Sequence, residues 1–162
     1  MPDLTVHYRD LAARPHLSAA SLANVDTDEA ASANAVLEEF LAADVLVIGV
    51  PMYNFNIPSQ LKAWMDRIAV AGKTFRYTAE GPVGLAGVKK MVVAGAYDGF
   101  HPTEGASNFI EPYLRFMFDF VGINDIEFVT AEGLALSPEQ RTTSIQAALA
   151  RIAATAPKVS AA

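Results

Sequence analysis

The sequence predicts an α/β fold in which helices cover both faces of a parallel β-sheet. Short runs of β-branched residues alternate with longer segments of helical periodicity, which is the pattern of right-handed strand–helix–strand units. The run at residues 45–50 (VLVIGV) is continuously apolar, as expected of a central strand buried on both faces. With 162 residues and 52% hydrophobic content, we expect a single domain over residues 1–162.

Four segments are expected as strands and four as helices, in alternation. The expected strands are residues 4–8, 45–50, 91–94 and 126–129, and the alternating pattern of the last one indicates an edge strand. The expected helices cover approximately residues 26–43, 58–71, 109–121 and 137–155. Pro58 suits a helix start, and Ser137 followed by Gln140 matches a capping box.

Composition excludes several classes of function. A formal net charge of -6 gives no attraction to nucleic acid or to anionic membranes, so neither is expected as a partner. The absence of cysteine excludes disulfides and thiolate metal sites, and no metal site is expected. No signal peptide or membrane-length apolar stretch is visible, which favours a cytoplasmic protein. No GxxxxGK[ST], GxGxxG, HExxH or GxSxG segment occurs.

The segment PMYNFNIP, residues 51–58, is the first candidate binding site. It follows the most apolar strand, and ligands of open parallel sheets bind beyond the carboxyl ends of the strands. Its alternating aromatic and amide residues suit a flat heteroaromatic ligand such as a redox ring. In the alternative reading, Asn54 and Asn56 form a turn and the aromatic residues fill the core. The position after a buried strand favours the binding site.

The segment GAYDGFH, residues 95–101, is the second candidate, because it follows the next strand. Its glycines permit close backbone approach, and His101 could donate a hydrogen bond or transfer a proton. The alternative is a solvated surface histidine. His7 and His16 are interpreted as structural.

Aromatic residues elsewhere indicate further contacts. The loop at residues 74–82 (TFRYTAEGP) is expected to be a lid, a subunit contact or a simply packed loop. Phe116, Phe118 and Phe120 crowd more than one face of their helix, so some should point outward, toward a partner subunit. Asp66 and Arg67 are interpreted as part of a solvated face.

Several of these segments together resemble one protein family. PMYNFNIPSQLKAWMDR is similar to the flavin-ring loop and following helix of FMN-dependent NADH azoreductases and related quinone reductases. The segments AGKTFRYTAEGPVGLAGVKK, GAYDGFH, PYLRFMFDFVGI and FVTAEGLALSPE resemble later family segments in the same order. The resemblance covers residues 44 to about 153, and residues 6–11 resemble the family's second strand and its exit.

The resemblance implies a flavodoxin-like sheet of five parallel strands and a homodimer with sites at its interface. It implies hydride transfer from NADH or NADPH to FMN and then to a quinone or azo compound, by a ping-pong mechanism. The residues that it assigns to the flavin are Pro51, Met52, Tyr53, Asn54, Phe55, Ala96, Tyr97, Asp98 and Gly99. It places His101 at the pyrimidine edge of the flavin as the catalytic residue, and Tyr77 and Phe120 in the substrate pocket.

Two departures from the family pattern modify these expectations. A Ser-Arg-Gly-Gly-like stretch is common where this chain has Ala96-Tyr97-Asp98-Gly99, so the flavin potential or the nucleotide preference should differ. The family's first strand, its serine-rich phosphate loop and its first helix have no counterpart here, so we expect an N-terminally truncated fold with a weaker phosphate anchor. Two alternatives therefore remain: a flavin-free relative that acts as a dimerising or small-ligand-binding module, and a quinone-binding sensor without turnover.

Overall fold

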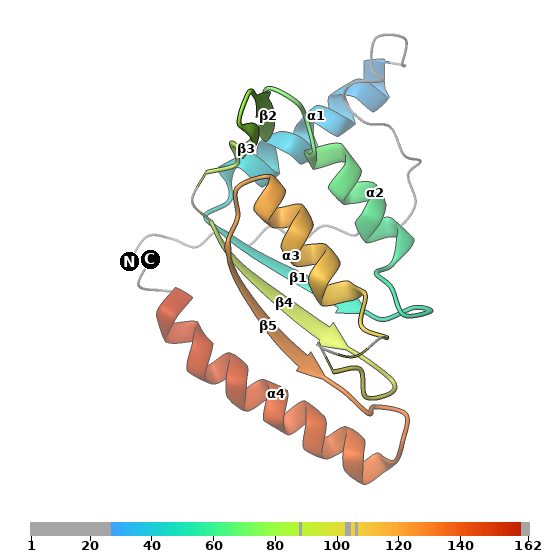
Figure 1. Ribbon diagram of the computed structural model, residues 1–162. Coiled ribbons are helices and arrows are strands. Elements are labelled where there is room, and N and C mark those ends of the chain that lie inside the picture. The colour runs from blue at the N-terminus through green and yellow to red at the C-terminus, as the bar shows by residue number, and fades with distance from the viewer. Residues whose placement is uncertain (1–26, 88, 103–104, 106, 160–162) are drawn as a thin grey trace.

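The computed structural model describes residues 27–87, 89–102, 105 and 107–159. Its centre is a parallel sheet in the order β1-β4-β5. The strands are β1 (Val45–Pro51), β4 (Lys90–Ala96) and β5 (Asp125–Ala131). One face is covered by α1 (Thr27–Ala42), α2 (Ser59–Ile68) and α3 (Ile110–Phe120), and the other by α4 (Pro138–Val159) (Figure 1). The predicted three-layer α/β architecture is confirmed.

The sheet follows the sequence prediction with one difference in burial. The three expected strands lie within one or two residues of their predicted bounds, and β5 pairs only with β4 among the described residues, as an edge strand. The apolar run of β1 predicts burial on both faces, but Val47 is 72% exposed. That prediction is wrong for one face of β1 within the described part of the chain. The expected strand at residues 4–8 lies outside the described residues.

The first helix is fixed to the sheet by a distant lysine. Val36, Leu37 and Phe40 of α1 are buried and Leu41 is half-buried, so these apolar side chains at helical spacing form the face of α1 that packs on the core. The last turn of α1 contains no basic residue, but the ammonium of Lys89 donates hydrogen bonds to the carbonyls of Leu41 and Ala43. Burial lowers the pKa of Lys89, and Asp44 partly opposes this shift. Lys89 therefore satisfies carbonyl groups that the helix end leaves without intrahelical partners.

Two predicted helices differ from the structure in detail. α2 begins one residue later than expected, with Pro58 as its N-cap, and it ends at Ile68. Arg67 is buried, so its interpretation as part of a solvated face is wrong. α4 begins as predicted because Ser137 Oγ accepts the N–H of Gln140, 3.1 Å away. The Gln140 side chain donates to Ser144 Oγ rather than back to the cap, so the capping box is only half formed.

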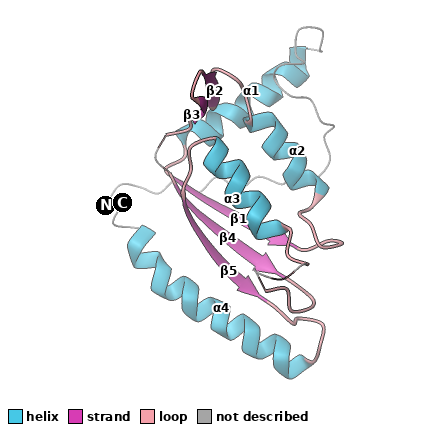
Figure 2. Cartoon of the chain, in the orientation of Figure 1, coloured by secondary structure: helices cyan, strands magenta, loops and turns pink. Residues whose placement is uncertain are grey.

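The loop expected at residues 74–82 contains a β-hairpin. β2 (Phe75–Thr78) pairs antiparallel with β3 (Gly81–Gly84) (Figure 2). The hydroxyl of Thr78 accepts the N–H of Glu80 and donates to the carbonyl of Gly81, which closes the turn. Leu85 N–H donates to Thr74 O, and Ala86 N–H donates to Val121 O, next to the end of α3. The reading of this segment as an irregular loop is therefore wrong.

Two arginines cover the open edge of β5. Arg115 of α3 donates to the carbonyl of Ile126 at 3.3 Å, and Arg151 of α4 donates to the carbonyl of Phe128 at 2.6 Å. The guanidinium of Arg115 also lies 4.6 Å from the centre of the Phe128 ring. Side chains from both helical layers thus occupy carbonyl groups that a further strand would need for pairing. Among the described residues, no helix is both long enough and apolar enough to cross a membrane.

Candidate functional site

Three loops meet beyond the carboxyl ends of the parallel strands. They cover residues 52–58 after β1, 97–102 and 107–109 after β4, and 132–137 after β5 (Figure 1). Met52 N–H donates to Ala96 O at 3.1 Å, and Tyr97 N–H donates to Ala131 O at 2.9 Å. Gly133 N–H donates to Gly99 O at 2.9 Å. The two candidate segments therefore lie side by side, at the edge of the sheet where a site was predicted.

The loop after β1 forms a tight, strained turn. Tyr53 and Asn56 exchange two backbone hydrogen bonds of 3.0 Å, and the residues between them, Asn54 and Phe55, have φ angles of 49° and 67°. They are the two non-glycine residues with positive φ in the described part of the chain. Because such geometry costs free energy, its retention at a loop tip indicates a functional site. The asparagines do form the turn, as in the alternative reading, but the aromatic rings do not fill the core.

The turn presents aromatic surface to solvent. The side chains of Tyr53 and Phe55 are 62% and 52% exposed, and Phe100 from the neighbouring loop is 57% exposed. Met52 and Pro51 are half-buried beneath them. An apolar surface with peptide groups at its tip matches the needs of a flat heteroaromatic ring, which combines apolar faces with a polar edge.

His101 connects the turn to the second loop. Its imidazole lies 5.7 Å from the ring of Phe55 and 6.1 Å from the ring of Tyr97, edge-on to both. Nδ1 of His101 lies 3.0 Å from Ser107 Oγ. The side chain is half-buried, so the alternative of a freely solvated histidine does not describe its environment.

The other predicted residues of this loop differ in their solvent exposure. Ala96 and Asp98 are exposed, and Gly99 is half-buried with its carbonyl bonded to Gly133. Tyr97 is only 2% exposed, so its ring belongs to the core, where it packs edge-on against the imidazole of His101. Burial, followed by the nearby carboxylates of Glu111 and Glu132, raises the pKa of Tyr97 to about 12, and a hydrogen bond with Thr130 opposes this shift.

Tyr77 and Phe120 lie together but away from these loops. Their ring centres are 6.5 Å apart, and Phe75 contacts both rings at 5.7 and 4.6 Å. This aromatic cluster lies on the β2–β3 hairpin and the last turn of α3, at the opposite end of the sheet from residues 52–58 (Figure 1). Tyr77 is 74% exposed. Within one chain, the structure does not bring the predicted substrate-pocket residues to the predicted flavin residues.

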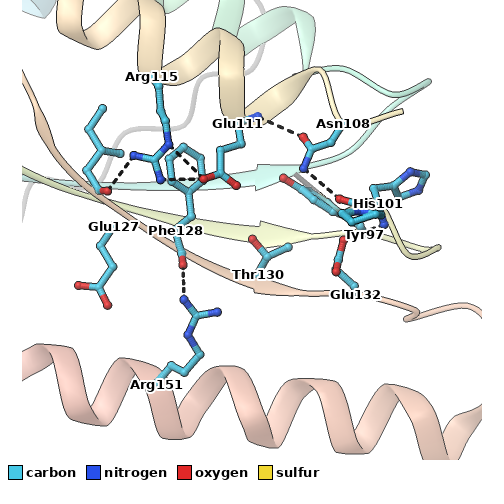
Figure 3. A pocket seen from close by; sticks show the side chains of 12 residues that line it. Tyr97, His101, Asn108, Glu111, Arg115, Glu127, Phe128, Thr130, Glu132 and Arg151 are labelled. Atoms are coloured by element: carbon cyan, nitrogen blue, oxygen red, sulfur yellow. Dashed lines mark hydrogen bonds and ion pairs between the residues drawn. The ribbon is translucent and has the colours of Figure 1, made fainter. Parts of the chain in front are cut away.

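A cavity of about 460 Å³ lies behind His101, between α3, the edge of β5 and α4 (Figure 3). Its lining is mainly polar and includes His101 and Tyr97 at one end and Arg115 and Arg151 at the other. Glu111 accepts two hydrogen bonds from Arg115, of 3.1 and 2.7 Å. No group of three or more acidic or histidine side chains able to bind a metal is found among the described residues.

Sequence reasoning missed three residues that contact His101. The His101 N–H donates to Glu132 Oε1 at 2.9 Å, its carbonyl accepts from Asn108 Nδ2 at 3.0 Å, and Ser107 contacts its ring. Glu132 could have been found, because it lies three residues after the predicted strand 126–129, at the expected edge of the sheet. Asn108 and Ser107 gave no such signal, since they lie in an irregular loop before α3.

Comparison with known proteins identifies the family. A family model described as having a flavodoxin-like fold matches residues 1–156. The chain is 56% identical over 155 residues to the FMN-dependent NADH:quinone oxidoreductase of Xanthomonas oryzae pv. oryzae strain MAFF 311018, a match that covers 94% of this chain and 79% of that protein. It is also 56% identical over 162 residues to FMN-dependent NADH:quinone oxidoreductase 2 of Pseudomonas aeruginosa PAO1, covering 93% and 80% of the two chains.

A solved structure with a bound flavin shares the fold. It is the FMN-dependent NADH-azoreductase of Bacillus anthracis str. Ames Ancestor in complex with FMN. The TM-score is 0.77 with 30% sequence identity, and the match covers 90% of this chain and 75% of that chain. The sequence identities, the matching fold and the position of the three loops agree: the chain belongs to the flavodoxin-like family of FMN-dependent NADH:quinone oxidoreductases.

Proposed function

We propose that this protein is an FMN-dependent oxidoreductase that uses NADH to reduce quinones, and azo compounds as a second substrate class. The observation that carries the proposal is the strained turn at residues 53–56, whose exposed aromatic rings lie beside His101. The relatives that are named as FMN-dependent NADH:quinone oxidoreductases are 56% identical to this chain.

The residues present fit the ring of FMN. The backbone groups of Asn54 and Phe55 lie at the loop tip, between the two hydrogen bonds that close the turn, and could bond the polar edge of a flavin. The exposed rings of Tyr53 and Phe55 supply apolar contact to its rim. The backbone of Ala96 to Gly99 approaches from the next strand, so the flavin would lie between the two loops.

FMN held by these loops would supply the redox chemistry, as acceptor of a hydride from NADH and donor of two electrons to the quinone. The protein's part is to hold the ring and to supply a proton, since reduction of a quinone to a hydroquinone by NADH consumes one proton. We assign this proton transfer to His101. Its Nδ1 is held by Ser107, which leaves Nε2 as the atom that gives the proton.

The separation of the aromatic cluster from the loops favours a homodimer. Tyr77 and Phe120 cannot line the same site as Phe55 within one chain, because they lie at opposite ends of the sheet. We propose that two copies associate, so that the aromatic cluster of one copy faces the flavin loops of the other. The exposure of Tyr77 and of Phe116, at 74% and 69%, supports an association through this face.

Titration with FMN tests the proposal. We expect saturable quenching of flavin fluorescence, a raised melting temperature, and NADH oxidation that depends on added 1,4-benzoquinone. Phe55→Ala should weaken FMN binding about fivefold, because an aromatic contact contributes about 1 kcal/mol. Leu149→Ala, which removes an exposed apolar side chain from α4, is the matched control. Riboflavin, titrated in parallel, measures what the phosphate adds to binding by this chain.

Each result has a distinct meaning. A folded protein that binds no flavin would contradict the proposal and favour the flavin-free binding module. Binding of 1,4-benzoquinone without NADH oxidation would instead favour a quinone sensor. Equal FMN affinity in Phe55→Ala and the parent chain would mean that the strained turn is not the flavin site.

A further inference from the structure

His101 is held by one side chain from its own loop and by one from another part of the fold. Its backbone N–H donates to Glu132 Oε1 at 2.9 Å, and its backbone carbonyl accepts from Asn108 Nδ2 at 3.0 Å. Glu132 follows β5, and Asn108 lies in the same loop as His101, just before α3. The position of the histidine therefore depends on one residue that is 31 positions away in the sequence and on one that is seven away.

Each of the two holding residues is itself fixed. Asn108 is 6% exposed, and its Oδ1 accepts the N–H groups of Ile110 and Glu111, both at 3.2 Å, at the first turn of α3. The carbonyl of Glu132 accepts from Ser144 Oγ of α4 at 2.6 Å. Figure 3 shows Asn108 and Glu132 on either side of the His101 backbone, at the end of the cavity nearest the flavin loops. The backbone of Glu132 is thus tied to α4, and the carboxamide of Asn108 is tied to α3.

An ordinary loop residue does not need this arrangement. Backbone groups at a surface bond well to water. Side chains that replace water at both the N–H and the carbonyl of one residue fix the position of that residue, and they lose conformational freedom themselves. A third contact, from Ser107 to Nδ1, fixes the rotation of the imidazole. Supporting contacts of this kind are what a catalytic side chain needs to stay within a fraction of an ångström of its working geometry.

We propose that Glu132 and Asn108 are positioning residues that hold His101 against Phe55, so that its Nε2 faces the reacting quinone. The inference rests on the proposed function only for the identity of the reaction, since the holding contacts exist in the chain without a ligand. Neither residue touches substrate in this assignment. Both act through the backbone of His101.

The chemistry of the contact predicts which substitutions are tolerated. Glu132 acts as an acceptor, and a glutamine oxygen can accept the same N–H, so Glu132→Gln should keep kcat within about threefold. Glu132→Ala removes the acceptor and should lower kcat about tenfold or more, with little change in the KM for NADH. Asn108→Ser keeps a helix cap but loses the donor to the His101 carbonyl, so it should also lower kcat without unfolding the protein.

The first readout needs no flavin. Amide hydrogen exchange, followed by NMR, should show the His101 N–H protected in the parent chain and in Glu132→Gln, and exchanging at least about tenfold faster in Glu132→Ala. The control is Glu127→Ala, which removes a carboxylate of β5 that lines the same cavity. It should leave the His101 amide and kcat unchanged. Melting temperatures of all variants separate loss of position from loss of the fold.

Turnover of the FMN-loaded protein with NADH and 1,4-benzoquinone is the second readout. If Glu132→Ala turns over like the parent chain, or if Glu132→Gln is as slow as Glu132→Ala, the positioning role is wrong. If the parent chain itself oxidises no NADH, the proposed function fails. In that case the amide exchange of His101 still decides whether Glu132 holds it.

Discussion

Tyr97 carries a buried phenol whose ionisation gives a prediction at the scale of one residue. Burial raises the pKa of Tyr97 to about 12 from an ordinary 10.0, so the folded state favours the neutral phenol. The resulting stability is fully present below about pH 10 and is lost as the pH rises through 12. We expect the free energy of unfolding to fall by roughly 1 to 2 kcal/mol more in the parent chain than in Tyr97→Phe over this range.

Urea unfolding at about pH 9 and at about pH 12, on either side of the ordinary pKa of tyrosine, measures the difference. Tyr77→Phe is the control, because the Tyr77 side chain is exposed. Equal losses in the parent chain and in Tyr97→Phe would contradict the prediction.

The turn at Asn54 gives a second prediction at this scale. At a φ of 49°, glycine is unstrained, asparagine is tolerated, and a β-branched side chain is strongly disfavoured. Asn54→Val should therefore be about 2 kcal/mol less stable than Asn54→Gly in urea unfolding. The same pair of substitutions at Asn124, which is exposed and has no positive φ, should show no such preference for glycine. A similar result at both positions would show that the turn is not strained.

At the scale of elements, local sequence signals explain which parts could be predicted. The β-branched runs and the helical spacing of apolar residues identified three described strands and all four described helices, because these patterns reflect burial against a single core. The β2–β3 hairpin has no alternating pattern and contains Gly81 and Pro82. The hairpin is held by contacts to residues outside it, such as Phe120. The sequence of the hairpin itself therefore contained too weak a pattern to predict two strands.

The hairpin depends on a close contact between two glycines. A Cβ atom added to Gly84 would overlap the backbone N and Cα of Gly122, which itself has a φ of 96°. Gly84→Ala should therefore lower the free energy of unfolding by about 3 kcal/mol, since backbone atoms on both sides must shift. Gly49→Ala in β1 is the matched control, because nothing lies within 4 Å of the position that its methyl group would take. Chemical denaturation of both variants tests the contact, and equal stability would contradict it.

At the scale of the whole molecule, the topology predicted where the site lies but not how it is supported. A parallel sheet places its ligand loops at the carboxyl ends of its strands, so residues 51–55 and 96–101 could be named from the sequence. The contacts that hold His101 could not be predicted, because Glu132 is 31 residues away and its carboxylate accepts a backbone N–H, which no side-chain pattern in the sequence signals. The separation of Tyr77 from Phe55 is also visible only in the folded structure and not in the sequence.

The proposed dimer gives a prediction at the same scale. Phe116 is 69% exposed on α3, on the face of the sheet that carries the hairpin, whereas Leu149 is 52% exposed on α4, on the other face. Phe116→Glu should weaken self-association by placing a charge in an apolar contact, and Leu149→Glu should not. Sedimentation velocity over a range of concentrations distinguishes them. A parent chain that is monomeric at all concentrations would contradict the dimer.

The arginines on the open edge of β5 have a consequence for the protein in a crowded cell. An uncovered edge strand is a template on which other chains can add strands and begin an aggregate. Arg115 and Arg151 approach that edge from opposite faces and occupy the carbonyls of Ile126 and Phe128. Because both carbonyl groups are already bonded to guanidinium groups, we expect this edge to be less able to pair with a strand of another chain, and therefore less prone to start an aggregate.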